Sequence, residues 1–227
     1  MAKPFSKTVI HNTDAKLSKQ VRQPLKTNQG IHKALTWRVV DIAVGAAVGV
    51  MSGVMFWVFD GLSYGLFPLM TLILPGSAAL LHALFYFPAT LGSLIVRKPG
   101  ASAYVLLVAS FVEVVLGTKY SVSLVVIALL QAAAAGFALF RYRRWTLGVT
   151  ILSALAIGIV YNFYLLFFYY QAFTFFSPRG IIGTICELLS AVAFAGFGSW
   201  GMYCALRKSG VLSRFASSHK EHNEENA

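Results

Sequence analysis

Asp60, His82, Glu113 and Glu187 are ionisable residues that stand within or at the edge of long apolar stretches of this sequence. Ionisable side chains are costly in a membrane interior and usually mark a binding site or a transport pathway there. Carboxylates accept strong, charge-assisted hydrogen bonds from cationic or N–H-bearing groups. These residues therefore predict a site for a ligand that carries positive charge or N–H donors.

Aromatic side chains accompany these polar residues. Trp57 and Tyr64 flank Asp60, and Tyr86 follows His82 by four residues, which places the two on one face of an α-helix. Aromatic faces and carboxylates together suit a flat, cationic or nitrogen-rich heterocycle, through stacking and cation–π attraction. With two amides and a further tyrosine, the predicted substrate-binding residues are Trp57, Asp60, Tyr64, His82, Tyr86, Glu113, Gln131, Tyr161, Asn162 and Glu187.

Each of these polar residues also has a structural interpretation that the sequence leaves open. Glu113 would neutralise Lys119 at the membrane interface, and Arg179, two turns from the deeper Glu187, would snorkel with it. The histidine and the two amides would instead pack between helices or bridge them by hydrogen bonds. Many of the aromatic residues would form an interfacial belt, since tyrosine and tryptophan favour headgroup depth.

The composition excludes several classes of function. Of the 227 residues, 57% are hydrophobic and only 12% are charged, whereas a soluble domain has about 25% charged residues. A soluble enzyme, a disordered protein and a nucleic-acid-binding domain are therefore excluded. The sequence has no phosphate-binding Gly-x-x-x-x-Gly-Lys-Ser/Thr loop, no His-Glu-x-x-His and no Gly-x-Ser-x-Gly. It predicts no enzyme, no cofactor and no metal site.

Breakers and charges divide the apolar region into six stretches that are long enough to span a membrane, which takes about 20 helical residues. A connection over about 60–75 contains two prolines, Arg97-Lys98-Pro99-Gly100 is typical of a turn, and Ser177-Pro178 predicts a helix start. The fold class is therefore an all-α integral membrane protein, a six-transmembrane-helix bundle. Its predicted spans are about 37–59, 76–96, 101–117, 120–140, 145–170 and 179–206.

The distribution of basic residues predicts the topology. With six spans, 17 of the 19 Lys and Arg residues fall on the side of the two termini, and the positive-inside rule makes that side cytoplasmic. The net charge of +11 then reflects topology in a prokaryotic plasma membrane. The predicted organisation is a mobile basic tail over 1–36, a six-helix membrane domain over 37–206 and a cytoplasmic tail over 207–227. The polar residues then gather in the outer half of the bundle, where they predict an outward-facing cavity.

Small residues give the first span two faces suited to close packing. Gly45, Gly49 and Gly53 recur every four residues, and Ala43 and Ala47 lie roughly opposite them on a helix. Small residues let membrane helices approach closely. One face would pack within the bundle and the alanine face against a separate membrane protein; the alternative is packing within the bundle on both faces.

Several segments resemble one known family. Trp37-Arg38-Val39-Val40-Asp41-Ile42, Phe56-Trp57, Ile95-Val96-Arg97-Lys98-Pro99-Gly100-Ala101, Glu113 to Gly117, and Gln131 with Phe140-Arg141-Tyr142-Arg143-Arg144-Trp145 are similar to the YkoE-type substrate-binding (S) component of energy-coupling factor transporters. The resemblance extends over residues 37 to about 206. It implies six helices and a pocket near the extracellular side for thiamine or its hydroxymethylpyrimidine precursor.

The same resemblance implies partners. A transmembrane coupling subunit and cytoplasmic ATPase subunits would drive import, and Ala43 and Ala47 match the Ala-x-x-x-Ala motif by which S components dock on the coupling subunit. Three other functions remain open at this point. They are an S component for another heterocyclic vitamin, a non-transporting membrane assembly protein and a solitary ion-coupled carrier that needs no ATPase partner.

Overall fold

The computed structural model describes residues 36–118, 121–142, 146–168 and 176–210. The chain divides into a unit of residues 1–37 and a unit of residues 38–227, and all helices named here belong to the second unit. The predicted tails over 1–36 and 207–227 lie almost entirely outside the described residues. In chain order the elements are α2 (Val39–Ile73), η1 (Ser77–Phe85), α3 (Phe87–Val96), α4 (Ala101–Val115), α5 (Ser121–Tyr142), α6 (Leu147–Phe168), α7 (Pro178–Ser190), η2 (Ala191–Gly198) and α8 (Ser199–Lys208).

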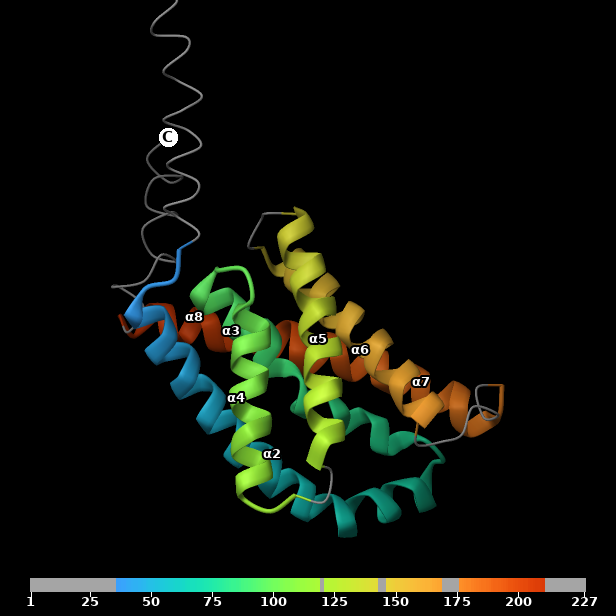
Figure 1. The fold of residues 1–227 in the computed structure, drawn as a ribbon. Coiled ribbons are helices and arrows are strands. Elements are labelled where there is room, and N and C mark those ends of the chain that lie inside the picture. Colours follow the sequence, from blue (N-terminus) through green and yellow to red (C-terminus); the bar gives the residue numbers. More distant parts are fainter. Residues whose placement is uncertain (1–35, 119–120, 143–145, 169–175, 211–227) are drawn as a thin grey trace, which may run out of the picture. The chain divides into compact units, whose positions relative to one another are not determined.

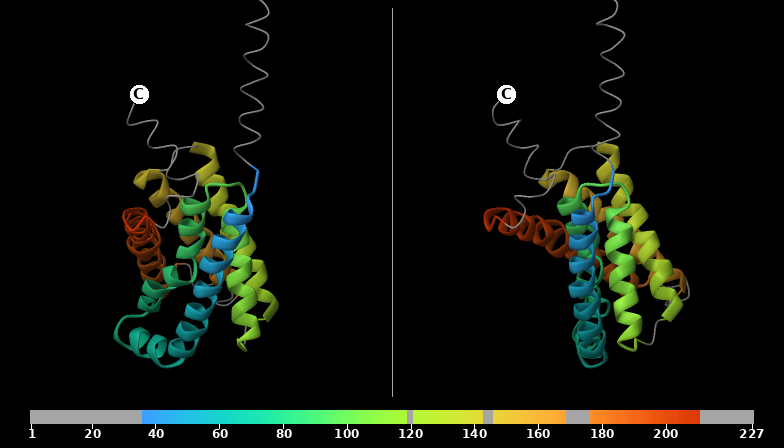
Figure 2. Two further views of the ribbon diagram at one scale, coloured as in Figure 1. Left: turned by 90° about the vertical axis from the view of Figure 1, so that its left-hand side faces the viewer. Right: turned by 60° about the vertical axis from the view of Figure 1, so that its left-hand side comes forward.

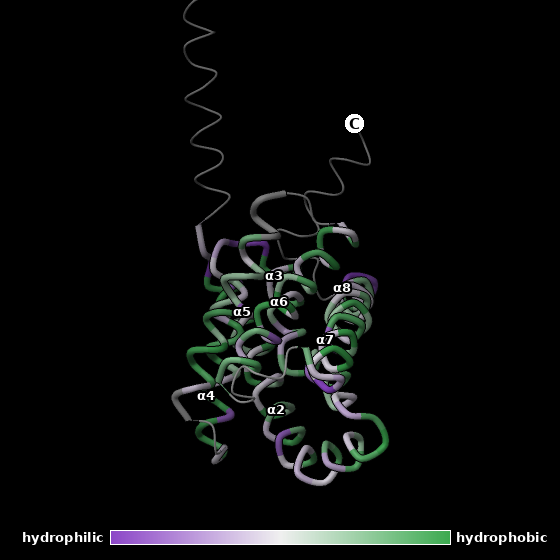
Figure 3. The backbone as a smooth tube through the Cα atoms, turned by 90° about the vertical axis from the view of Figure 1, so that its right-hand side faces the viewer, coloured by the Kyte–Doolittle hydropathy of each residue, from purple (hydrophilic) through white to green (hydrophobic). Residues whose placement is uncertain are grey.

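Every one of these elements is helical, and the described residues contain no strand. Four helical segments are long and apolar enough to cross a membrane, and two shorter apolar helices accompany them. Large apolar side chains such as Leu72 and Phe111 are exposed on their outer faces, as expected where lipid is the solvent. Hydrophobic residues predominate along the helices in Figure 3. The four segments are Val39–Ile73, Ser77–Val96, Leu147–Phe168 and Pro178–Lys208, and the shorter helices are Ala101–Val115 and Ser123–Phe137.

The glycine face of α2 packs against α4, and the two helices lie side by side (Figures 1 and 2). A Cβ atom added at Gly49 would lie 2.7 Å from the side chain of Val108, and one at Gly53 would lie 2.5 Å from the carbonyl oxygen of Ala109. Only glycine permits this approach. The alanines at 43 and 47 on the other face of α2 are exposed in the described unit.

The predicted end of the first helix at about residue 59 is wrong, because α2 continues through Asp60 and Gly61 to Ile73, so the predicted connection over 60–75 is mostly helical. Pro68 lies inside this helix, where proline removes one backbone hydrogen bond and favours a kink. The Thr71 hydroxyl donates to the carbonyl oxygens of Phe67 and Pro68 at 2.9 Å, so both of its bonds are made to the preceding turn of the same helix. Figure 1 shows that the second half of α2 runs in a different direction from the first.

The second predicted span, 76–96, is not one regular helix. It begins as the nine-residue 3₁₀-helix η1, passes through Tyr86 and continues as α3. Runs of 3₁₀-helix longer than three or four residues are uncommon and often mark a functional or strained segment. Here Ser190 of α7 supports η1 from outside, since its hydroxyl donates to the Leu80 carbonyl at 2.6 Å and accepts from the Ala83 amide at 3.3 Å.

The helix start predicted at Ser177-Pro178 is confirmed, because the Ser177 hydroxyl accepts from the Gly180 amide at 3.1 Å and Pro178 occupies the first turn. The helix then changes to a π-helix over Ala191–Gly198 before α8. Its small residues pack against α6. The turn predicted at 97–100 is also confirmed: Arg97 and Gly100 have φ angles of 52° and 80°.

Adding a methyl group at Gly53 tests the α2–α4 contact. Gly53→Ala should destabilise the protein by about 1–3 kcal/mol, because the new Cβ meets backbone and has no room. Gly61→Ala in the same helix is the matched control, since nothing lies within 4 Å of its added Cβ. Thermal unfolding in detergent measures both variants. Equal midpoints for the two variants would contradict the packing described here.

Candidate functional site

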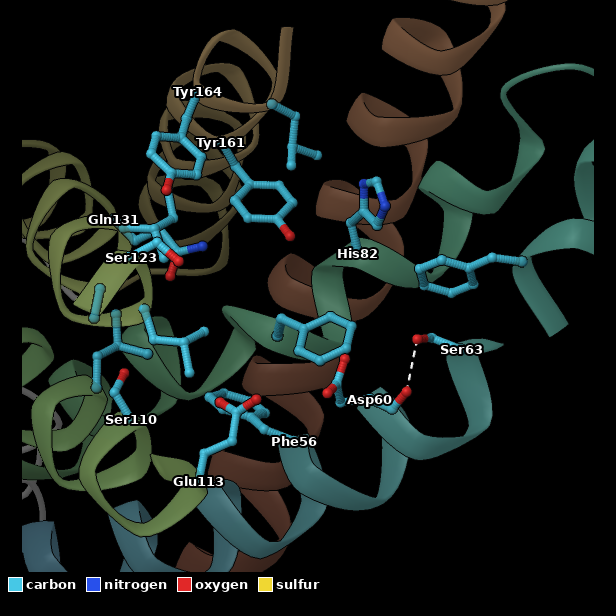
Figure 4. A pocket seen from close by; sticks show the side chains of 17 residues that line it. Phe56, Asp60, Ser63, His82, Ser110, Glu113, Ser123, Gln131, Tyr161 and Tyr164 are labelled. Carbon is cyan, nitrogen blue, oxygen red and sulfur yellow. Dashed lines mark hydrogen bonds between the residues drawn. The ribbon is translucent and has the colours of Figure 1, made fainter. Parts of the chain in front are cut away.

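A cavity of about 280 Å³ lies among five elements of the second unit. Its volume is close to the lower end of small-molecule sites, roughly 300–1,000 Å³. Figure 4 shows the labelled side chains converging on this space. The lining residues are Phe56, Asp60, Ser63 and Phe67 of α2, His82 and Phe85 of η1, Leu106, Ser110 and Glu113 of α4, Ser123, Leu124, Ile127, Ala128 and Gln131 of α5, and Tyr161, Tyr164 and Leu165 of α6.

Helical periodicity explains which residues reach the cavity. On α4 and α5 the lining residues recur every three or four positions, so each helix presents one stripe. The 3₁₀-helix η1 instead has three residues per turn, which aligns His82 with Phe85 rather than with Tyr86. Tyr86, expected beside His82 on an α-helix, is fully buried behind the cavity wall.

Three polar side chains on α4 and α5 are buried at the cavity without a hydrogen-bond partner among the described residues. They are Ser110, Glu113 and Gln131, with exposed fractions of 4%, 2% and 3%. Buried polar groups nearly always have a partner, and an unpaired one costs about 1–3 kcal/mol. A ligand that hydrogen-bonds this wall would supply that partner.

Aromatic rings form much of the remaining wall. Phe56 and Phe85 have ring centroids 5.7 Å apart, and His82 contacts Tyr161 edge-on at 5.3 Å. Asp60 lies on the same stripe of α2 as Phe56 and accepts a hydrogen bond from the Thr118 hydroxyl at 3.4 Å. The cavity therefore combines ring surfaces with two carboxyl groups, Asp60 and Glu113.

A hydrogen-bonded cluster lies directly behind this wall. His82 Nδ1 is 2.6 Å from one oxygen of Glu187, and the Tyr86 hydroxyl donates to the other at 2.8 Å. Glu187 is 1% exposed and does not line the cavity. The structure therefore places Glu187 behind His82 and does not pair it with Arg179.

The structure brings Asp60, His82, Glu113, Gln131 and Tyr161 together at the cavity. Trp57 and Tyr64 are 44% and 60% exposed and do not line it. Both lie about 80–100° around α2 from Phe56, because each residue advances an α-helix by about 100°.

Asn162 also lies away from the cavity. Its side chain donates to the Thr184 hydroxyl at 3.0 Å, next to a smaller pocket of about 50 Å³. Sequence reasoning missed Ser63, Phe67 and Phe85, because it ended the first helix at about residue 59 and predicted one regular span over 76–96. Ser110 could have been predicted from the sequence, since it precedes Glu113 by three residues and therefore lies on the same face of the helix.

The described ranges contain no group of three or more His, Cys, Asp or Glu side chains placed to hold a metal ion. The polar side chains at the cavity are instead spread over several helices and alternate with aromatic rings. This lining is typical of a site for a small organic molecule with a few polar groups.

Comparison with known proteins identifies similar chains. Residues 40–160 match a family model described as "ABC-type cobalt transport system, permease component". The chain is 23% identical over 184 residues to the "Putative HMP/thiamine permease protein YkoE" of Bacillus subtilis (strain 168), covering 80% of this chain and 90% of that protein. It also resembles a solved structure titled "Crystal structure of an S-component of ECF transporter", with a TM-score of 0.73, 20% identity and coverage of 84% of this chain and 96% of the other. The fold is therefore that of an S-component.

Removal of the Ser190 hydroxyl tests the support of η1 by α7. Ser190→Ala leaves the Ala83 amide and the Leu80 carbonyl without this partner, so the free energy of unfolding should fall by about 1–3 kcal/mol. The control is Ser209→Ala, whose exposed hydroxyl bonds only its own helix end, with a change within about 0.5 kcal/mol. Thermal unfolding distinguishes the two, and a Ser190→Ala protein as stable as the control would contradict the support.

Proposed function

The chain belongs to the family of ABC-type cobalt transport system permease components, and we propose that it is the substrate-binding (S) component of an energy-coupling factor transporter that imports thiamine or its hydroxymethylpyrimidine precursor. It is a transport component rather than an enzyme, as the sequence predicted. The fold shared with an S-component and the similarity to a protein named as an HMP/thiamine permease support the proposal.

The observation that carries the proposal is the cavity wall of α4 and α5. Glu113, Gln131 and Ser110 are buried there without described partners and line one space. An aminopyrimidine presents N–H donors and ring-nitrogen acceptors along one edge, which carboxylate, amide and hydroxyl groups can pair with. A cationic thiazolium ring adds attraction to carboxylates and to aromatic faces.

The aromatic lining also favours a flat organic ligand over the cobalt in the family's description. Phe56, Phe85 and Tyr161 offer ring surfaces against which a heterocycle stacks. These rings would add binding energy for a heterocycle, whereas benzene rings do not ligate a divalent metal ion. The ligand class is therefore a small, nitrogen-rich heterocycle.

For the membrane arrangement, the proposal is six spans with both termini in the cytoplasm. The four long apolar helical segments and the two shorter apolar helices would supply these spans. The distribution of Lys and Arg supports this orientation. In it, the polar residues of the cavity lie in the half of the bundle that faces outward, where a nutrient arrives.

The exposed alanine face of α2 is the proposed docking site for the coupling subunit. Ala43 and Ala47 are exposed, while the glycine face of the same helix is used by α4. Small side chains allow a partner helix to approach closely in lipid. ATPase subunits bound to the coupling subunit would supply the energy for import.

Neutralising Glu113 tests the ligand assignment. Glu113→Gln keeps the shape of the side chain but removes its charge, so the affinity for thiamine or hydroxymethylpyrimidine should fall at least tenfold, about 1.4 kcal/mol. Isothermal titration calorimetry in detergent measures the affinity. The control is Asp41→Asn, since Asp41 caps the start of α2 through the Arg38 amide and does not line the cavity. Unchanged affinity in Glu113→Gln would contradict the ligand assignment. So would thermal unfolding in which riboflavin stabilises the wild type while thiamine and hydroxymethylpyrimidine do not.

Enlarging Ala47 tests the docking face. Ala47→Trp should abolish co-purification with the coupling subunit, because the indole prevents close helix approach, while the affinity for thiamine stays unchanged. Ala133→Trp is the matched control, since this alanine of α5 is also exposed and should retain the coupling subunit. Equal co-purification of both variants would exclude the alanine face as the docking site.

A further inference from the structure

We propose that Glu187 acts on the ligand through His82, by holding the imidazole in the tautomer that turns an unprotonated Nε2 toward the cavity. This inference rests on the proposed function for the identity of the ligand, but the arrangement of the side chains is independent of it. It makes Glu187 a positioning residue, and it makes His82 the group that contacts the ligand.

The contacts of Glu187 show why it does not face the ligand itself. One carboxylate oxygen is 2.6 Å from His82 Nδ1 and the other accepts from the Tyr86 hydroxyl at 2.8 Å. Both oxygens therefore have protein partners, and the side chain is 1% exposed outside the cavity lining. Such a carboxylate fixes its neighbours rather than a substrate.

The His82 ring is held in orientation as well as in position. Phe67 contacts it at 5.8 Å with an interplanar angle of 64°, and Tyr161 contacts it at 5.3 Å with an angle of 78°. These edge-to-face contacts and the bond to Glu187 define the plane of the ring. Because Nδ1 is engaged, Nε2 is the nitrogen available to a ligand in the cavity that His82 lines.

The backbone that carries His82 is anchored by the same helix that carries Glu187. Ser190 follows Glu187 by three residues on α7, so the two lie on one helical face. Ser190 bonds the Leu80 carbonyl and the Ala83 amide, on either side of His82. Two neighbouring side chains of α7 therefore fix both the imidazole and the 3₁₀ turn beneath it.

The tautomer follows from the chemistry of the partner. An ionised carboxylate has no proton to donate, so the proton in the short bond resides on Nδ1, and the bond made by one ring nitrogen sets the state of the other. In the neutral ring Nε2 is then an acceptor. Glu113 offers a second acceptor from α4, in a different part of the cavity (Figure 4). The site would therefore favour heterocycles with N–H donors over isosteric analogues with a carbonyl oxygen at the same position.

The tautomer can be measured in the protein without any ligand. Long-range ¹H–¹⁵N correlation of histidine-labelled protein in detergent reports which ring nitrogen carries the proton. The sequence has 5 histidines, and the signal lost in His82→Gln identifies His82. The expected result is a ring protonated on Nδ1 alone, with the signal shifted in Glu187→Gln. A proton on Nε2 would overturn the proposal.

Thiamine binding supplies the second measurement, through a double-mutant cycle. His82→Gln and Glu187→Gln should each weaken affinity about tenfold or more, because each disrupts a hydrogen bond on which the proposed contact depends. If Glu187 acts through His82, the double variant binds no more weakly than His82→Gln. Effects that multiply in the double variant would overturn the proposal.

Two controls complete the experiment. Glu113→Gln combined with Glu187→Gln should show effects that multiply, since these residues lie on different helices and share no contact. If Glu187→Gln does not fold, Tyr86→Phe replaces it in the cycle, because Tyr86 donates to the same carboxylate. A wild-type protein that binds neither thiamine nor hydroxymethylpyrimidine would refute the proposed function alone, and the tautomer measurement would then decide the role of Glu187.

Discussion

The burial of carboxyl groups inside an apolar helical bundle is the constraint on which the rest of this structure depends. A charged side chain removed from water is stable only when it is paired or hydrogen-bonded. The protein meets this requirement for Glu187, through His82 and Tyr86. It leaves Glu113 without a described partner at the cavity. In the proposed function, Glu187 therefore supports the site from behind, and Glu113 belongs to the surface that binds the ligand.

Irregular helices provide the geometry that this separation needs. A regular α-helix through η1 would turn Tyr86 toward the cavity with His82, whereas the 3₁₀ turn aligns His82 with Phe85 and leaves Tyr86 for Glu187. An unusual 3₁₀ run of this length requires outside support, which Ser190 supplies. The π-helix begins immediately after that residue, so the irregular backbone is concentrated where the helices meet behind the site.

Small residues decide which face of α2 is used within the bundle. The glycine face contacts α4 closely enough that an added Cβ would collide with it, so this face has no room for another partner. The alanine face of α2 is exposed. The same helix later contributes Asp60 and Phe67 to the cavity, and it therefore connects the proposed docking face with the proposed ligand site through one continuous backbone.

The sequence by itself determined the helical, membrane-embedded character of the chain, because hydropathy and breakers act locally. It also determined the glycine and alanine faces of α2 and five of the residues that line the cavity, Asp60, His82, Glu113, Gln131 and Tyr161. It did not determine that α2 continues past Gly61 or that η1 is a 3₁₀-helix, since tertiary contacts override local preference at both places. Only the tertiary structure decided that Glu187 supports His82, because residues 105 positions apart in the chain meet through packing and not through spacing.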